Sequence, residues 1–313
     1  ATPTSAVGAS RLQCYMEVTK ARLSALVVFT TAVGYVAAVG WSADWVRLLC
    51  AVVGTALAAG CASVLNQMIE RDRDRSMNRT QDRPLPSGMM SMRHASVLAI
   101  LLGAGGLTIL AAGTNIMAML LAAITIVLYA GIYTPAKVIS PINTLIGAVC
   151  GAIPPMIGWV AATDQFGVGA WILGALLFIW QLPHFFALAW MYRDDYARGG
   201  FRMLPSVDDT GRWTGGISFA TSAILIPIGI IATMTDVAGV WFLTVSVGLG
   251  LWMTWLAWRF MRQRDHQRAR SLFLASITYL PLLLAVLLIE PSPTSQNGVE
   301  PAETIAQVDS TRP

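Results

Sequence analysis

The stretch Leu65–Gly88, LNQMIERDRDRSMNRTQDRPLPSG, carries five arginines and four acids between two long apolar segments of the chain. Such crowding is unexpected, because the 313-residue chain is 55% hydrophobic and only 12% charged. A soluble domain would carry about a quarter charged residues. The apolar segments on either side therefore decide the fold, and the charged stretch has to be explained within it.

Nine apolar segments are each long enough to cross a bilayer, which needs roughly 20 residues. Their hydrophobicity does not alternate from residue to residue, so helices and not barrel strands are expected to satisfy the backbone in lipid. The sequence predicts an all-α, polytopic membrane protein with nine transmembrane helices. The predicted spans are residues 23–40, 46–67, 95–113, 115–133, 142–162, 168–190, 216–235, 237–258 and 270–289.

The basic residues fall almost entirely on alternate connections between these spans. The N-terminal segment and the even-numbered connections carry Arg11, Lys20, Arg22, the arginines of Leu65–Gly88, Lys137, Arg193, Arg198, Arg202, Arg212, Arg259, Arg262, Arg264, Arg268 and Arg270. The odd connections carry Asp44, Asp164 and Asp236, with Arg47 as the one basic exception. The positive-inside rule predicts a cytoplasmic N-terminus and an outer C-terminus. The net charge of +4 is then a topology signal, and no nucleic-acid partner is expected.

The chain divides into three parts by composition. Residues 1–19 are predicted to form an N-terminal cytoplasmic arm, and residues 20–290 the membrane domain. Residues 291–313 are rich in Pro, Ser, Thr and Gln, which predicts a disordered tail.

Asn66, Glu70 and Asp74 are spaced four apart, so on a helix they line one face. The helix that begins near Trp45 would only have to continue past Asn66 to carry them all. An amide and two carboxylates make a hard-oxygen site of the kind that Mg²⁺ prefers, with substrate phosphates completing it. Asp72 points elsewhere and is expected to pair with neighbouring arginines. The alternative for the whole stretch is a solvated, salt-bridged loop.

A second polar cluster is WQLPHFFALAWMYRDDYARGG, at the end of the sixth span. Gln181 and His184 lie within the apolar run, where polar groups usually face the bundle interior or a cavity. On an unbroken helix Asp195 lies about three turns beyond His184, so both would share a face. The alternative for His184 is a satisfied packing partner.

A third cluster places Tyr129, Tyr133 and Lys137 four apart, with Pro135 expected to distort the last turn. Lys137 could also serve orientation alone. The three clusters and Arg22 are predicted to end on the same, cytoplasmic side of the bundle. Acids for a metal and cations for phosphate oxygens would meet there beside apolar helices. That combination favours a substrate with a diphosphate head and a long hydrocarbon tail.

At this point the sequence resembles a known family, the UbiA superfamily of intramembrane prenyltransferases, and within it the branch of protohaem IX farnesyltransferases (haem O synthases). The likeness extends from about Lys20 to Glu290. The stretches that carry it are LNQMIERDRDRSMNRTQDRPLPSG, YTPAKVISPINTLIGAVCGAIPPMIGW, WQLPHFFALAW and YRDDYARGGFRML.

The resemblance implies nine transmembrane helices around a central cavity and a Mg²⁺-dependent reaction with one or two ions. A farnesyl group would pass from farnesyl diphosphate to a vinyl group of protohaem IX, and water would add to give haem O. The resemblance also suggests a haem A synthase as a partner that takes the product. It places the chain in a bacterial cytoplasmic membrane, or in the mitochondrial inner membrane of a eukaryote.

The superfamily's first acidic motif falls on Asn66, Glu70 and Asp74, with Glu where Asp is commoner. Its second motif, two aspartates four apart, is absent, because Arg198 follows Asp194 and Gly199 follows Asp195. Asp-Tyr, as in Asp195–Tyr196, is typical of the haem branch. The resemblance assigns catalysis to Asn66, Glu70, Asp74 and Asp195, and metal binding to these and Asp194. The polar clusters themselves predict diphosphate binding by Arg22, Tyr133, Lys137 and Arg193, and haem binding by His184 and Gln181.

Three rival functions remain open from the sequence. A UbiA-type enzyme could use a different aromatic or lipid acceptor. A secondary transporter could also have nine spans with intramembrane polar groups, although the polar groups gather on one side and not at the midplane. A non-catalytic assembly factor is the third alternative.

Overall fold

A computed structural model describes residues 11–78 and 80–290 of the chain. The predicted disordered tail, the first ten residues of the predicted arm, and Arg79 of the charged stretch lie outside the described residues. The elements in chain order are α1 (Arg11–Val18), α2 (Ala21–Val39), α3 (Trp45–Asp74), α4 (Met92–Gly113), α5 (Ile116–Ile126), the π-helical η1 (Val127–Tyr133), α6 (Thr134–Ile139), α7 (Asn143–Thr163), α8 (Val168–Met191), α9 (Arg193–Arg198), α10 (Leu204–Val207), α11 (Arg212–Met234), α12 (Val240–Arg262) and α13 (His266–Ile289).

Within residues 11–78 and 80–290, nine helical segments are long and apolar enough to cross a membrane, and no strand is present. They are α2, α3, α4, the continuous α5–η1–α6 segment, α7, α8, α11, α12 and α13. The prediction of an all-α protein with nine transmembrane helices is confirmed. With 30 residues, α3 is about 45 Å long at 1.5 Å per residue. That exceeds the roughly 30 Å of a bilayer core, so one end of α3 extends beyond the apolar part of the bundle.

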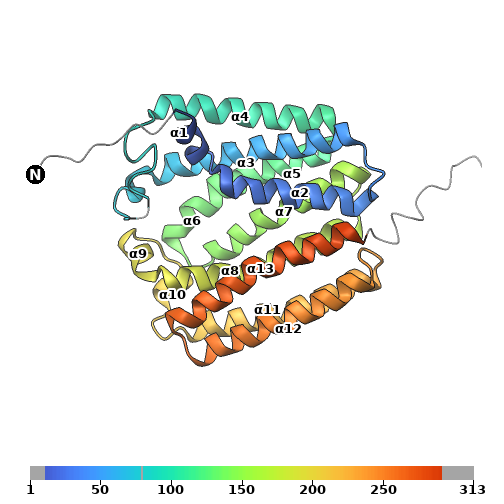
Figure 1. Cartoon of the computed structure of the whole chain (residues 1–313). Coiled ribbons are helices and arrows are strands. Elements are labelled where there is room, and N and C mark those ends of the chain that lie inside the picture. The colour runs from blue at the N-terminus through green and yellow to red at the C-terminus, as the bar shows by residue number, and fades with distance from the viewer. Residues whose placement is uncertain (1–10, 79, 291–313) are drawn as a thin grey trace, which may run out of the picture.

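The helices pack side by side in one bundle (Figure 1). The N-terminal helices α2, α3 and α4 lie along one side of it, and α11, α12 and α13 lie along the other, with α7 and α8 between them. At the crossing of α2 and α7, a Cβ on Gly34 would lie 2.1 Å from the Pro155 carbonyl oxygen. A Cβ on Gly158 would lie 1.9 Å from the Thr31 carbonyl oxygen. Close backbone contact at glycine is how helices associate in lipid.

The fourth span contains the distortion that Pro135 predicts. Proline lacks an amide hydrogen and its ring collides with the preceding turn. The chain accommodates it by widening to the π-helical turn η1 directly ahead of it. The Thr134 amide accordingly donates to the Tyr129 carbonyl, five residues back.

The short elements α1, α6, α9 and α10 gather at one end of the bundle, together with the C-terminal end of α3 (Figure 1). The described part of the predicted arm forms α1, which packs against α2 and α3. The orientation of this end toward the cytoplasm stays a prediction.

At the opposite end, the one basic residue that breaks the alternation is paired. Arg47, near the start of α3, forms an ion pair with Asp164, which follows α7. Asn115 donates to the same carboxylate and to the Val160 carbonyl, each at 2.8 Å. The Arg47 hydrogen bond holds the pKa of the Asp164 carboxyl below its usual value. Arg47 therefore joins three helices at this end and does not contradict the predicted topology.

Candidate active site

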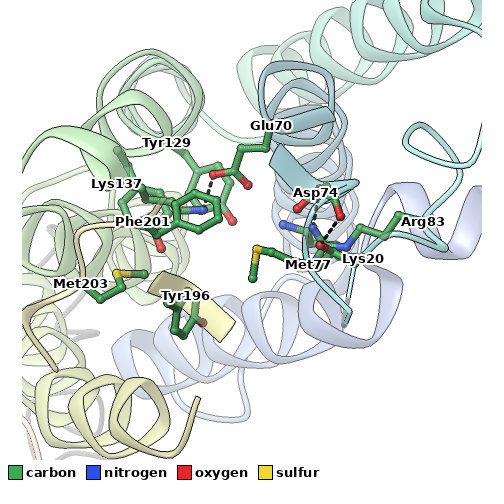
Figure 2. Close-up of a pocket in the computed structure, with 12 residues that line it drawn as sticks. Lys20, Glu70, Asp74, Met77, Arg83, Tyr129, Lys137, Tyr196, Phe201 and Met203 are labelled. Atoms are coloured by element: carbon green, nitrogen blue, oxygen red, sulfur yellow. Dashed lines mark hydrogen bonds and ion pairs between the residues drawn. The ribbon is translucent and has the colours of Figure 1, made fainter. Parts of the chain in front are cut away.

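A polar cavity of about 140 Å³ lies at the end of the bundle where the short elements gather (Figure 2). Its walls come from α3, η1, α6, α9 and the segments that follow α1, α3 and α9. The lining residues are Lys20, Glu70, Asp74, Met77, Thr80, Arg83, Tyr129, Tyr133, Lys137, Tyr196, Phe201 and Met203.

The acidic wall is the last part of α3. Asn66, Glu70 and Asp74 are all buried, with exposed fractions of 0%, 4% and 2%. Asp72 points the other way, its side chain 87% exposed and 3.4 Å from Arg75. The predicted helical face is thus confirmed, and the alternative of a solvated loop is wrong for this segment, because α3 continues unbroken to Asp74.

Each polar group of the acidic wall has a cationic partner. Lys137 Nζ lies 2.8 Å from Glu70 Oε1, and an Arg83 guanidinium nitrogen lies 2.9 Å from Asp74 Oδ2. Both ion pairs are drawn as dashed lines in Figure 2 and border the same cavity. The two carboxylates are thereby neutralised inside the protein.

Lys20 provides the third cation of the cavity. Its Nζ donates to Asn66 Oδ1 at 2.7 Å, while the Asn66 amide donates to Thr134 Oγ1 at 3.0 Å. Burial lowers the pKa of the Lys20 ammonium below its ordinary value. A buried ammonium of this kind favours the arrival of an anion, which would offset its lost hydration.

The wall facing α3 is aromatic. Tyr129 and Tyr133 project from η1 with ring centroids 5.2 Å apart, and Lys137 Nζ lies 4.5 Å from the Tyr133 ring centre. Tyr196, Phe201 and Met203 complete this side.

The segment between α9 and α10 is fixed in place by backbone contacts. The Arg202 amide donates to the Lys137 carbonyl at 2.7 Å. The Asn143 side chain donates to the Arg202 carbonyl at 3.0 Å. These bonds hold Phe201 and Met203 across the cavity from α3.

The second acidic cluster differs from its prediction. The expectation that His184 and Asp195 share a face needs an unbroken helix, and it is wrong, because α8 ends at Met191. Tyr192 leaves helical geometry with φ −115° and ψ 21°, and α9 begins anew at Arg193. Helical spacing therefore does not relate His184 to Asp195.

The charged residues of α9 do not line the cavity. Asp194 is 88% exposed. Asp195 pairs with Arg198 at 2.8 Å. The Arg193 guanidinium lies 4.8 Å from the Trp190 ring centre. Of this segment, only Tyr196 reaches the cavity lining.

His184 and Gln181 lie deeper in the bundle. The His184 ring stacks on Trp180 with centroids 5.3 Å apart, and its Nδ1 lies 2.8 Å from Ser276 Oγ of α13. The Gln181 amide donates to the Leu177 carbonyl at 3.0 Å. Neither residue is among those that line the cavity.

Two cations of the cavity escaped sequence reasoning. The sequence predicts Arg22 as a diphosphate-binding residue, but Arg22 is exposed on α2 and does not line the cavity. Lys20 does line it. Arg83 lies in an irregular connection, where no periodicity relates it to Asp74. In the sequence, Arg83 follows the helix that carries the acidic motif, whereas Lys20 precedes α2 and is not next to that helix.

The donor chemistry of the cavity fits Mg²⁺. Among the described residues, no group of three or more His, Cys, Asp or Glu side chains could hold a metal. The site offers two carboxylates and an amide on one helix face. Mg²⁺ typically binds one or two carboxylates and completes its shell with waters and substrate phosphates.

Comparisons with known proteins identify the family of this chain. Residues 27–280 match the UbiA prenyltransferase family. A protein named protoheme IX farnesyltransferase from Opitutus terrae is 43% identical over 88% of this chain and 94% of its own length. The mitochondrial protein of that name from Arabidopsis thaliana is also 43% identical, and this chain spans 64% of its length.

Solved structures share the fold at low identity. A digeranylgeranylglyceryl phosphate synthase superposes with a TM-score of 0.77 at 16% identity, over 89% of this chain and 97% of that one. A UbiA homologue from Archaeoglobus fulgidus, bound to GPP and Mg²⁺, has a TM-score of 0.63 at 17% identity, over 88% and 99%. The chain belongs to the UbiA prenyltransferase family, in the branch whose members are named protoheme IX farnesyltransferase.

Proposed function

We propose that this protein transfers the farnesyl group of farnesyl diphosphate to a vinyl group of protohaem IX, with addition of water, to give haem O and diphosphate. The observation that carries the proposal is the cavity in which two carboxylates of α3 meet three cations, at one end of an apolar bundle. A diphosphate can bind there while its hydrocarbon chain lies among the helices. The curated relatives supply the acceptor, since they are named for protohaem IX.

Lys20, Arg83 and Lys137 are the residues that bind the diphosphate in this proposal. Each now bonds to a member of the acidic motif, at 2.7, 2.9 and 2.8 Å. A diphosphate carries more negative charge than a single carboxylate or a neutral amide, and its oxygens accept several charge-assisted bonds at once. When the substrate enters, the three cations exchange motif oxygens for phosphate oxygens. Tyr133 lies under Lys137 and orients it.

The same exchange frees Asn66, Glu70 and Asp74 to hold Mg²⁺. When bound, Mg²⁺ would neutralise charge on the departing diphosphate. Asp195 and Asp194 are candidates for a second ion. For Asp195 this requires release from Arg198, which lies on the exposed side of α9. Arg193, next to both acids, then faces the same anion.

The aromatic wall stabilises the allylic cation that forms as diphosphate leaves. Ring faces attract cations, and the Tyr133 face already carries the Lys137 ammonium. Tyr129 and Phe201 add further aromatic rings to the lining of the cavity. The vinyl group of protohaem then attacks the allylic carbon, and the positive charge moves to the carbon beside the porphyrin ring. Water adds to that carbon and releases one proton, which leaves a hydroxyl group. The protein aligns the two carbons and restricts water until that step.

His184 and Gln181 remain proposed haem-binding residues. With Nδ1 held by Ser276, the other ring nitrogen of His184 is the one that could bind iron or a propionate. The visible spectrum of the haem-loaded protein tests this: His184→Ala should shift the Soret band and weaken haem binding. An unchanged spectrum and affinity would make His184 a packing residue.

The deciding experiment is incubation of the purified protein with protohaem IX, farnesyl diphosphate and Mg²⁺, followed by mass analysis of the haem. A haem heavier by one farnesyl group and one hydroxyl group is expected. Prenylation of another aromatic or lipid acceptor, with protohaem unchanged, would indicate a UbiA enzyme of different specificity. Uptake of substrate into vesicles without any product would indicate a transporter.

We place the active site on the cytoplasmic side of a bacterial cytoplasmic membrane, or on the matrix side of a mitochondrial inner membrane, because the basic connections gather at the cavity end. The product would pass to a haem A synthase.

A further inference from the structure

Lys20 has a backbone conformation that few residues with a side chain adopt. Its φ of 51° and ψ of 47° lie in the left-handed region, which is disfavoured for residues other than glycine. The Lys20 amide donates to the Glu17 carbonyl at 3.1 Å, and its carbonyl accepts from the amides of Leu23 and Ser24. Lys20 therefore links the two helices: its amide bonds to the last turn of α1, and its carbonyl accepts from the first turn of α2. The direction of its side chain depends on where the last turn of α1 is held.

The last turn of α1 is held by Gln67 of α3. The final carbonyls of a helix have no partner within the helix. Gln67 Nε2 donates to two of these acceptors, the carbonyls of Glu17 and Val18, each at 3.1 Å. Gln67 itself is fully buried, as is the Val18 side chain beside it. This contact is a side-chain cap that crosses from one helix to another.

The neighbouring residue on α3 holds the other end of Lys20. Asn66 Oδ1 accepts from Lys20 Nζ at 2.7 Å, while Gln67 fixes the backbone from which that side chain starts. Two consecutive residues of α3 thus fix Lys20: Asn66 holds its ammonium group, and Gln67 holds the backbone just before it. Gln67 is not among the residues that line the cavity.

We propose that Gln67 is a positioning residue for diphosphate binding and acts through Lys20. The proposal rests on the diphosphate-binding role of Lys20 in the proposed function. Without the two bonds from Gln67, the end of α1 loses its fixed register against α3, and the left-handed turn at Lys20 is no longer held in place. The ammonium group then spends less time where a phosphate oxygen can meet it.

Gln67 also has a feature that makes its replacement tolerable for folding. Its Oε1 accepts no hydrogen bond from the described residues. A buried acceptor without a partner is costly, so Gln67→Met removes that cost together with the two donated bonds. We therefore expect Gln67→Met to fold and purify as the wild type does.

The test is a double-mutant cycle read by calorimetric binding of inorganic diphosphate in the presence of Mg²⁺. The variants are Gln67→Met, Lys20→Met and the double variant, with the exposed Gln81→Met as the matched control. Gln67→Met should weaken diphosphate binding about tenfold, while Gln81→Met should leave it unchanged. In the Lys20→Met background, Gln67→Met should cause less than a twofold further loss.

The same variants should raise the KM for farnesyl diphosphate more than they lower kcat, because a mispositioned Lys20 first weakens binding. If Gln67→Met does not accumulate in the membrane, Gln67→Leu provides the test, since its side chain also lacks a hydrogen-bond donor.

Two results would overturn the proposal: wild-type diphosphate affinity in Gln67→Met, or an equal loss in the presence and absence of the Lys20 side chain. The cycle measures diphosphate alone, so it is independent of the acceptor. Failure to form haem O would overturn the proposed function and leave the role of Gln67 standing.

Discussion

The helix α3 carries ion pairs at both of its ends, and the two ends differ in what surrounds them. At its start, Arg47 pairs with Asp164, and Asn115 bonds to the same carboxylate. At its end, Glu70 and Asp74 pair with Lys137 and Arg83 around a cavity of about 140 Å³. The Arg47–Asp164 pair joins the start of α3 to the end of α7. The pairs at the end border space that another anion can enter.

The difference shows that ion pairs of the same chemistry have different roles according to what their partners can reach. The acids of the cavity sit at the C-terminal end of α3, where the helix dipole is already negative and favours cations. Three cations supplied by other segments balance that field and can turn to a phosphate. At the start of α3, Arg47 and Asn115 also donate to the carbonyls of Thr114 and Val160, which fix them in place.

The largest effect should come from the acids of the cavity. Asp74→Ala should lower kcat/KM at least about 100-fold, because removal of one preorganised electrostatic group typically costs that much. The protein should still insert and purify. Asp72→Ala, on the exposed face of the same helix, is the matched control and should stay near wild type. An inactive Asp72→Ala beside an active Asp74→Ala would show that the wrong face of α3 has been assigned.

The cations of the cavity should come next. Lys137→Met should weaken farnesyl diphosphate binding about 10- to 100-fold, since a hydrogen bond to a charged group contributes roughly 1.5–3 kcal/mol. Haem binding should change less. Arg22 is exposed on α2 outside the cavity. The variant Arg22→Met therefore tests whether Arg22 binds farnesyl diphosphate or only sets the orientation of the chain in the membrane. Separate titrations of the two substrates provide the measurement, and unchanged affinity in Lys137→Met would reduce that residue to an orientation signal.

The exchange of partners predicts that metal and diphosphate help each other to bind. Mn²⁺, followed by electron paramagnetic resonance, should bind weakly alone, because Lys137 and Arg83 occupy the carboxylates. Inorganic diphosphate should raise its affinity about tenfold, within the usual range of coupling between sites. Lys137→Met should strengthen Mn²⁺ binding alone and reduce the gain from diphosphate. Equal Mn²⁺ affinity with and without diphosphate in the wild type would contradict the exchange.

The parts of this site that the sequence could predict are those carried by a regular helix. The period of 3.6 residues places Asn66, Glu70 and Asp74 on one face and Asp72 on another, and the structure has them so. The nine spans follow from length and hydropathy in the same way.

The rest comes from segments without a period. Lys20 reaches the cavity through a left-handed turn, and Arg83 does so from an irregular connection. The same reason explains why the prediction that His184 and Asp195 share a helical face is wrong. It assumes helical spacing across Tyr192, but α8 ends at Met191. Contacts between distant segments depend on tertiary packing, which a single sequence does not encode in any local pattern.

The smallest effect should come from the other end of α3. Because Arg47 lowers the pKa of Asp164, their pairing stabilises the folded state above the pKa of an unfolded aspartate, near 4. That contribution is lost as the pH falls through the lower, folded pKa. Since the Asp164 side chain is 58% exposed, solvent screening limits the effect to less than about 1 kcal/mol.

Asp164→Asn should therefore lower the thermal midpoint in detergent by a few degrees at most at pH 7, and the gap from wild type should close as the medium is acidified toward pH 3. Diphosphate affinity should be unchanged in the variant, because the Arg47–Asp164 ion pair lies at the other end of α3 and does not border the cavity. A loss of diphosphate affinity in Asp164→Asn would mean that α3 transmits strain along its length, and the two ends could then no longer be treated as independent.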